Sequence, residues 1–457
     1  MLNTELLTST PVQEFIQNAI KKKMDALQIS TALNKAGYSN EDRATIMDYM
    51  ALVPKFREKF FGKDAVKASS GKNAATGSDV FLLCDRLALE QSTAQDIGKY
   101  KANLWISGQA RPRVHDLCCG MGGDSYFIPT EFNVTGVDLD KDRLAMYRHN
   151  VQVMRSFRDA NNCTDCTILA DVREVAKLAN VSGSDHPADY FTIDPARRAV
   201  EGENQRDLRN LTPTFEEVLE ISRHYKGGMA KLPPGYPTDE IPTDAELMYL
   251  GSHSDCRELL VLFGALAKNP GKVRAIMVDR DGQAVKTADG VAAEWSGTLS
   301  EIQAASNKDA EHDLPGCERS FRNATSENDL PVGDVAEYLA EPTALLIRSH
   351  LFGTVAKAST PDAHLISEGI AYVSCSTPLP APAFANFQVL DKCEITTSAV
   401  RDMLKRHGIG KLTLKLRGVK VDPDEEIKRL KPKGKNEAIL FYTRVAGEKT
   451  AILAKRV

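Results

Sequence analysis

Four aspartates of this sequence stand where a short apolar segment or a tight turn ends: Asp124, Asp138, Asp171 and Asp194. Three of them follow predicted strands, and Asp124 follows a glycine-rich turn. If the strands are parallel, their carboxyl ends meet at one edge of the sheet, where ligands of open α/β folds bind. The sequence therefore predicts that these carboxylates converge on one crevice shaped for a nucleotide.

The glycine-rich turn lies in residues 114–138, which read VHDLCCGMGGDSYFIPTEFNVTGVD. We expect a strand over Val114–Leu117, a turn over Gly120–Gly123 and a helix that begins at Asp124–Ser125. A turn without side chains lets a ligand approach the backbone, and a carboxylate about 20 residues later suits a ribose diol. The dinucleotide fingerprint G-x-G-x-x-G is missing. The alternative is a purely structural turn between two buried strands.

Strand-like and helix-like segments alternate after this turn, which predicts a parallel sheet covered by helices. Helices are expected over residues 141–157 and 214–224. The apolar segments 259–263 and 273–278 are separated by the short turn Asn269–Gly271, so we expect an antiparallel hairpin at the sheet edge. The other strands are expected over residues 166–170, 188–193 and 228–232.

The composition is that of a globular protein with more than one domain. The chain has 457 residues, of which 42% are hydrophobic and 26% are charged, and its net charge is −4; this length predicts two or three domains. No apolar run reaches the roughly 20 residues that span a bilayer, so no membrane segment is expected. The N-terminus lacks the basic and apolar regions of a secretory signal.

The cysteines predict a reduced, cytoplasmic protein without a metal. There are nine, an odd and sparse set, which favours free thiols over a disulfide framework. Cys163 and Cys166 form a lone C-x-x-C pair with no second pair and no histidine nearby. A zinc site there would lack half of its ligands.

Three domains are predicted: an N-terminal helical domain over residues 1–78, an α/β core over 79–330 and an α+β module over 331–457. Residues 68–79 are rich in Ser, Gly, Ala and Asn and are expected to form a loose connection. Residues 280–330 are polar, and we expect them to decorate the sheet edge and link the core to the last module.

The last module is predicted to be a small basic α+β sandwich. From Val400 to Val457 there are sixteen Lys or Arg against seven Asp or Glu. A basic module suits a partner with a phosphate backbone; the alternative is a solvated surface without a partner. Helices are expected over residues 335–350 and 399–407, and strands over 369–373, 411–416, 437–443 and 450–454.

Six segments together resemble the bacterial THUMP-like methyltransferases that use S-adenosylmethionine (SAM), a family whose core is related to the RNA cap trimethylguanosine synthases. They are Leu89–Thr93, Asp116–Ser125, Gly136–Asp140, Asp194–Arg198, Lys231–Gly235 and Lys415–Val419. The resemblance implies a Rossmann-like class I methyltransferase core and a C-terminal ferredoxin-like, THUMP-like module. Because THUMP modules occur in RNA-modifying enzymes, it also implies that the basic module binds RNA.

The resemblance implies SAM as the cofactor and gives its contacts. The glycine-rich loop would hold the methionine part, Asp138 the ribose and Asp171 the adenine amino group. A helix within residues 81–105 would close over the cofactor, and Ser92 or Thr93 would either cap that helix, our preferred interpretation, or contact the SAM carboxylate. The implied cofactor-binding residues are Thr93, Asp116, Cys118, Gly120, Gly122, Gly123, Asp124, Ser125, Asp138, Leu139, Asp171 and Val172.

The acceptor side is predicted at Asp194-Pro195-Ala196-Arg197. Cap enzymes and N6-adenine enzymes carry an aromatic residue after the proline, and this sequence has none. The Asp-Pro-Pro-Arg motif of 5-methyluridine enzymes is closer, but neither Cys256 nor Cys375 fits the nucleophile that those enzymes need. The predicted catalytic residues are Asp194, which would orient an acceptor nitrogen, Pro195, which would shape the turn, and Arg197, which would hold a phosphate or base edge.

Two of these residues have structural alternatives: a helix cap for Asp194 and a salt bridge for Arg197. The predicted function is methyl transfer from SAM to a nucleotide in RNA. Two other functions stay open at this point: a SAM-binding protein that holds RNA without transferring methyl groups, and a methyltransferase that acts on a small molecule.

Overall fold

The computed structural model describes residues 3–61, 81–105, 111–156, 166–197, 208–287, 290–303 and 330–457. The expected connection over residues 68–79 and the C-x-x-C cysteine Cys163 lie outside these ranges. The chain divides into two compact units, and the boundaries of the three expected domains remain predictions. The first unit contains Met1–Leu232, Val261–Lys268 and Val278–Gln283; the second contains Pro233–Leu260, Asn269–Met277 and Ala284–Val457.

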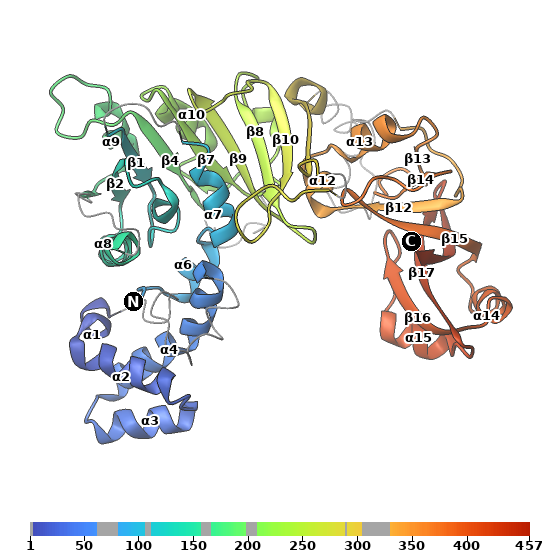
Figure 1. Ribbon diagram of the computed structural model, residues 1–457, viewed down its shortest axis with the longest axis horizontal. Coiled ribbons are helices and arrows are strands. Elements are labelled where there is room, and N and C mark those ends of the chain that lie inside the picture. Colours follow the sequence, from blue (N-terminus) through green and yellow to red (C-terminus); the bar gives the residue numbers. More distant parts are fainter. Residues whose placement is uncertain are drawn as a thin grey trace. The chain divides into compact units, whose positions relative to one another are not determined.

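Residues 3–61 are helical, as predicted. Asp25 begins the third helix with a capping box, because its carboxylate accepts from the Gln28 N–H while the Gln28 side chain accepts from the Asp25 N–H. The apolar faces of these helices share one core with residues 81–89, 119–127 and 144–154, and Phe60 meets the Tyr126 ring edge-on at 5.4 Å. The helices are α1 (Thr4–Thr8), α2 (Thr10–Lys21), α3 (Ala26–Lys35) and α4 (Asn40–Phe61) (Figure 1).

A nine-stranded sheet follows, with the strand order β11-β10-β8-β9-β7-β4-β1-β2-β3. Within this sheet, β1 (Arg113–Leu117) runs parallel to β2 (Asn133–Asp138) on one side and to β4 (Tyr190–Ile193) on the other. β3 (Cys166–Leu169) and β7 (Gly227–Leu232) extend the parallel part. All four residues of β4 are buried, as expected where helices cover both faces. The predicted parallel sheet is confirmed.

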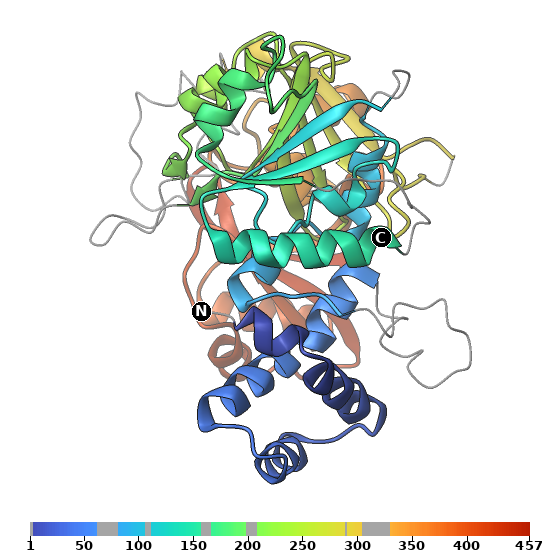
Figure 2. The same cartoon turned by 90° about the vertical axis from the view of Figure 1, so that its left-hand side faces the viewer.

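Helices connect these strands and cover them. The longest of those that follow β1, α8 (Lys141–Ser156), packs against β2 and β3 (Figure 2). The helix expected from Asp124–Ser125 is instead a single 3₁₀ turn, η2 (Ser125–Phe127). It stops because Ile128 is extended before Pro129, and a residue before proline avoids the α conformation. The other helices of this part are α6 (Arg86–Gln91), α7 (Gln95–Ala102), α9 (Val172–Leu178) and α10 (Phe215–Ser222).

The far side of the sheet differs from the prediction. β9 (Cys256–Gly264) and β10 (Lys272–Met277) are separated in the sheet by β8 (Glu246–Gly251), so the expected hairpin of 259–263 with 273–278 is wrong. β8 and β9 are instead joined by a turn in which the Ser252 N–H donates to the Asp255 carbonyl. β10 runs parallel to β8 and antiparallel to β11 (Glu294–Thr298).

A seven-stranded sheet makes up the C-terminal module, with the order β13-β14-β12-β15-β18-β17-β16. The predicted helix α14 (Thr397–Arg406) and strands β16 (Ile409–Leu416), β17 (Asn436–Val445) and β18 (Glu448–Arg456) are confirmed. Four elements had no counterpart in the prediction: α13 (Phe352–Ser359), β13 (His364–Leu365), β15 (Phe384–Glu394) and α15 (Pro423–Leu430).

Two predictions in this module are wrong. The expected helix over residues 335–350 begins with a strand, β12 (Tyr338–Pro342), and only Ala344–Arg348 (α12) is helical. β12 hydrogen-bonds to strands on both sides, and this pairing overrides the helical preference of its alanine and leucine. The expected strand at 369–373 is β14 (Val373–Cys375), which follows β13 (His364–Leu365) and the helix α13 (Phe352–Ser359).

Candidate active site

The turn after β1 is built from left-handed backbone. Cys118, Gly120 and Gly122 have φ angles of 58°, 52° and 90°, a region that glycine adopts without strain. A side chain at Gly122 would meet the Val151 methyl at 2.9 Å, and one at Gly123 would meet the Ser92 Cβ at 2.9 Å. Around the Cβ position of Gly120, by contrast, no atom lies within 4 Å. The loop therefore packs tightly on its protein side and offers open space at Gly120.

Asp138 ends β2 and holds this loop. One carboxylate oxygen accepts a hydrogen bond from the Gly120 N–H at 3.0 Å, and the other accepts from the Asp140 N–H at 3.0 Å. The next residue, Leu139, is 67% exposed. The structure thus places Asp138 and Leu139 at the rim of the glycine loop.

Asp116 forms the buried floor of the loop. Its carboxyl group receives a hydrogen bond from the Ser125 hydroxyl at 2.5 Å, and that hydroxyl lies 2.8 Å from the Tyr147 hydroxyl. Burial, followed by the nearby charge of Asp124, raises the pKa of Asp116 to about 8. Asp116 is therefore uncharged near neutral pH, and both it and Ser125 are engaged inside the protein.

Replacing Asp116 with asparagine is expected to change the pH dependence of stability. The folded-state pKa of about 8 lies above the ordinary value of 3.8, so between these values the folded wild type binds more protons than the unfolded chain. Wild-type stability relative to Asp116→Asn should therefore fall with rising pH, by up to about 1.4 kcal/mol per pH unit. Melting temperatures of both proteins from pH 5 to 8 test this, and a constant difference would contradict it.

Asp124 takes part in a buried ion pair behind the loop. Its carboxylate accepts from Lys101 of α7 at 2.5 Å and from the Thr93 hydroxyl at 2.7 Å, and the Lys101 and Asp124 side chains are only 5% and 10% exposed. Burial alone would raise the pKa of Asp124, but the charges of Lys101 and Lys231 outweigh it and lower that pKa to about 2. The ion pair fastens α7 to the loop.

The preferred cap interpretation for Ser92 and Thr93 is wrong. The residue before α7 is Ala94, which makes no side-chain cap hydrogen bond. Ser92 instead ends α6, where its hydroxyl donates to the Leu89 carbonyl. Thr93 is turned toward Asp124, so it contributes to the loop's support.

Replacing Lys101 with methionine should destabilise the protein by roughly 3–5 kcal/mol, because a buried carboxylate would lose its partner. The measurement is the free energy of unfolding in urea at pH 7. The double variant Lys101→Met/Asp124→Asn is the matched control and should recover most of the loss, since both charges are then gone. Equal stabilities of the single variant and the wild type would show that the pair contributes nothing.

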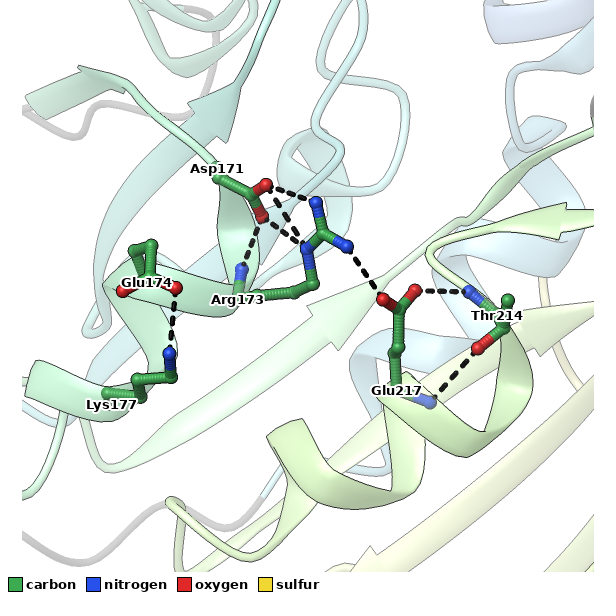
Figure 3. A network of polar contacts seen from close by, with 6 residues as sticks. All are labelled: Asp171, Arg173, Glu174, Lys177, Thr214 and Glu217. Atoms are coloured by element: carbon green, nitrogen blue, oxygen red, sulfur yellow. Dashed lines mark hydrogen bonds and ion pairs between the residues drawn. The ribbon is translucent and has the colours of Figure 1, made fainter.

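Asp171 lies two residues beyond β3 and caps α9, with Val172 as the first helical residue. Figure 3 shows its carboxylate beside Arg173, which donates from Nε at 2.9 Å and from Nη2 at 2.5 Å. The same guanidinium reaches Glu217 of α10 at 2.6 Å. These bonds from Arg173 lower the pKa of Asp171. Asp171 thus lies at the predicted strand end, already anchored by a neighbouring cation.

Asp194 follows β4 and is bound by a lysine from β7. Its carboxylate accepts from Lys231 Nζ at 2.7 Å, and the same ammonium donates to the Gln91 carbonyl at 2.9 Å. Asp194 is not a helix cap, because the next element is the short strand β5 (Ala196–Arg197), paired with β6 (Leu211–Thr212). The structural alternative for Asp194 is therefore wrong.

Of the other predicted acceptor residues, Pro195 is buried in the turn and Arg197 is exposed on β5. No ion pair joins Arg197 to a residue that the structure describes. Its side chain is thus exposed near the carboxyl end of β4. Arg198, the last residue of the motif, lies outside the described ranges.

Three of the four aspartates that the sequence predicts to converge, Asp138, Asp171 and Asp194, lie around one residue. That residue is Cys118 in the glycine loop, whose thiol pKa is raised by burial and then further by the carboxylates around it. Asp116 lies beside the same thiol. Asp124 belongs to the same group, because the charge of Lys231 lowers the pKa of Asp124 and the same ammonium pairs with Asp194. Strand ends from β1 to β4 therefore meet at one site.

Two lysines of this site, Lys101 and Lys231, were not among the predicted site residues. Lys231 belongs to the segment Lys231–Gly235 that carries part of the resemblance, so its position at the end of a core strand was a usable signal. Lys101 gave a weaker signal, because its partner Asp124 lies 23 residues later. Its burial depends on how α7 packs.

No group of three or more His, Cys, Asp or Glu residues in the described ranges is arranged to hold a metal ion. Across those same ranges, we find no helix with the length and apolarity that a membrane crossing requires.

The fold is that of a class I methyltransferase. A crystal structure described as a proposed methyltransferase from Porphyromonas gingivalis W83 matches all of this chain and 99% of its own, with a TM-score of 0.64 and 18% identity. Residues 385–456 match the family described as THUMP domain-like, so the C-terminal module belongs to that domain family.

Two relatives in Mycobacterium tuberculosis, in strains CDC 1551 / Oshkosh and ATCC 25618 / H37Rv, are each named an uncharacterized S-adenosylmethionine-dependent methyltransferase. Each is 23% identical to this chain over 364 residues, which cover 78% of this chain and 83% of the relative. The similarity therefore extends well beyond the THUMP domain-like module.

Proposed function

We propose that this protein is a SAM-dependent methyltransferase that modifies a nucleotide in RNA. The observation that carries the proposal is the meeting of the glycine loop with Asp138, Asp171 and Asp194 at the carboxyl ends of parallel strands. Ligands of open α/β sheets bind at this edge. The class I methyltransferase fold and the names of the mycobacterial relatives support SAM as the cofactor.

The residues of the loop suit SAM. The open backbone at Gly120 would receive the methionine part, and the Asp138 carboxylate, which already accepts the Gly120 N–H, has lone pairs left for the two ribose hydroxyls. Asp171 and Val172 would contact the adenine. Thr93, Asp116, Asp124 and Ser125 would act one layer behind, because the structure shows them bound to each other or to core groups. When bound, SAM supplies an electrophilic methyl group on its sulfonium sulfur.

On the acceptor side the protein's task is alignment, since methyl transfer from a sulfonium needs little acid–base help. Asp194, held by Lys231, would accept a hydrogen bond from an amino or ring N–H and so direct the nitrogen lone pair toward the methyl group. Pro195 fixes the turn that carries this carboxylate. Exposed Arg197 would hold a phosphate or a base edge through its planar donors.

RNA is the proposed substrate class because a basic THUMP domain-like module accompanies the fold. Phosphate contacts from Lys and Arg supply sequence-independent affinity for nucleic acid. A nucleotide within a folded RNA would have to be unstacked before Asp194 could reach its base.

The test is incubation of the purified protein with tritiated SAM and total RNA from a strain that lacks the gene. We expect acid-precipitable label that ribonuclease releases and that RNA from the complemented strain does not take up. Calorimetry with SAM runs in parallel. SAM binding without label in RNA would overturn methyl transfer to RNA.

One observation favours a second candidate, a SAM-binding protein that holds RNA without methyl transfer. Ala196 and Arg197 follow Pro195, and neither is the aromatic residue that the enzymes of the resemblance carry after the proline to stack on the target base. The same experiment separates the two functions, because the second predicts SAM binding and RNA binding with no incorporated label.

A further inference from the structure

The two cations of the segment Lys415–Val419, which carries part of the resemblance, point into the C-terminal module. Lys415 forms an ion pair with Glu341 of β12 and lies 5.3 Å from the centre of the Phe387 ring. Arg417 donates to the Ala371 carbonyl at 2.6 Å and stacks over Tyr372 at 4.6 Å. These cations hold β16 to other parts of the module, so the phosphate-binding charges must be sought elsewhere.

The densest remaining run of lysine and arginine extends from the last turn of α15 to the start of β17. Residues 428–435, which we name the lysine loop, read KRLKPKGK and contain no acid. Arg429 pairs with Glu426 inside this region. The side chains of Lys428, Lys431, Lys433 and Lys435 are exposed, and none of the four pairs with a carboxylate of a described residue.

The backbone of the lysine loop is held in place. The Gly408 carbonyl, just after α14, accepts from the N–H groups of Lys435 and Asn436, both at 3.0 Å. The backbone of Gly434 lies directly against the backbone of residues 408–410. A Cβ at Gly434 would lie 2.0 Å from the Gly408 oxygen, and a Cβ at Gly410 would lie 2.0 Å from the Gly434 oxygen. These contacts dock the loop on the turn that ends α14.

This docking adds charge from α14 to the same end of the module. Lys405 is exposed in the last turn of α14, three residues before Gly408. Arg406 is also there, although it pairs with Asp391 at 2.8 Å. Cations at helix ends often serve only to balance the helix dipole. Lys433 and Lys435 lie beyond the end of α15 at Leu430, so that role does not account for them.

The composition of the surface indicates how it binds. From residue 388 to residue 440 the chain has no Phe, Tyr or Trp, and the imidazole of His407, beside the turn on which the lysine loop docks, is held by Asp391 at 3.0 Å. The loop itself therefore carries no ring on which a base could stack. Recognition of single-stranded RNA relies on such rings. Lysines without aromatic neighbours suit the phosphate backbone, which carries no direct sequence information.

We propose that the lysine loop is the surface through which the C-terminal module binds the phosphate backbone of folded RNA, without sequence preference. This inference rests on the proposed RNA substrate and names the residues that hold it. Selection of the target nucleotide then falls to the residues around Asp194.

The test compares two charge-matched double variants of the full-length protein. Lys431→Glu/Lys433→Glu changes the lysine loop. Lys420→Glu/Lys449→Glu changes two exposed lysines beyond the other ends of β16 and β17, which pair in parallel. Both variants change the net charge by the same amount. Binding is measured by fluorescence anisotropy with a labelled RNA hairpin and with an unstructured oligouridylate of equal length, over a series of salt concentrations.

We expect the lysine-loop variant to bind the hairpin roughly tenfold more weakly than wild type, and its salt dependence to lose a slope of about two. The control variant should stay within about twofold of wild type. Wild type should also prefer the hairpin to oligouridylate. Calorimetry with SAM should give wild-type affinity for both variants, which shows that the core is intact.

Equal losses in the two double variants would mean diffuse charge and would overturn the assignment. Unchanged hairpin binding by the lysine-loop variant would overturn it too, and would point to an acidic protein as the partner of these lysines. A protein that binds RNA through the lysine loop but incorporates no methyl label would refute the proposed methyl transfer alone.

Discussion

Replacing Asp194 with alanine is expected to lower methyl transfer at saturating SAM by about a hundredfold or more while the affinity for SAM stays near the wild-type value. The reason is that Asp194 is predicted to orient the acceptor, a contribution typical of a positioned acid–base group, whereas the proposed SAM contacts lie at the ends of β1, β2 and β3. Single-turnover transfer from tritiated SAM to RNA of the strain that lacks the gene measures the rate of methyl transfer, and calorimetry with SAM measures the affinity.

Two further variants define the role of Asp194. Asp194→Asn keeps the size of the side chain and should lose less activity than the alanine variant. Lys231→Met removes the ammonium that contacts Asp194 at 2.7 Å and should also lower the transfer rate more than the SAM affinity. Wild-type transfer by Asp194→Ala would show that the catalytic assignment is wrong.

Replacing Asp138 with alanine should weaken SAM binding by about a hundredfold. The carboxylate is predicted to hold two ribose hydroxyls, and hydrogen bonds to a charged group contribute about 1.5–3 kcal/mol each. The variant would also release the Gly120 N–H, which Asp138 accepts at 3.0 Å. Calorimetry with SAM is the measurement.

Asp142→Ala is the matched control for this change, since Asp142 lies in the first turn of α8, four residues from Asp138, and is assigned no SAM contact. It should bind SAM with wild-type affinity. If both variants bind SAM equally well, the ribose is held by other groups. If both lose binding, the effect is a general one of negative charge near the loop.

The parallel half of the fold could be predicted because its sequence pattern has one physical cause. Strands such as Tyr190–Ile193 are buried on both faces and are therefore mostly apolar, and an acidic residue stands at or just after the point where the strand reaches the carboxyl edge of the sheet. That rule placed Asp138, Asp171 and Asp194 together without knowledge of any side-chain contact.

The antiparallel parts were harder for equally physical reasons. β8 begins with Glu246, which is buried but binds Asn269 and Arg274, so the strand did not look apolar at its start. β15 has a bulge between Val389 and Asp391, which breaks the alternation of inward and outward side chains on which a strand prediction depends.

Within the site, the aspartates were predictable and the lysines that support them were not. Asp194 could be predicted as a site residue from its position directly after a strand. The partners Lys101 and Lys231 come from a helix and a strand far along the chain, and only the packing of α7 and β7 brings them to Asp124 and Asp194. Burial keeps Asp116 neutral, whereas the charges of Lys101 and Lys231 keep Asp124 ionised in spite of its burial.

The edge-on contact of Phe60 with Tyr126 has a consequence for how the chain can be divided. Tyr126 also donates its hydroxyl proton to the Met121 carbonyl inside the glycine loop, so the N-terminal helices pack against a side chain that supports this loop. A fragment that begins at residue 81 would present a bare aromatic surface directly behind that loop. The helical segment is thus a structural part of the unit that contains the glycine loop, and it cannot be exchanged as an independent domain.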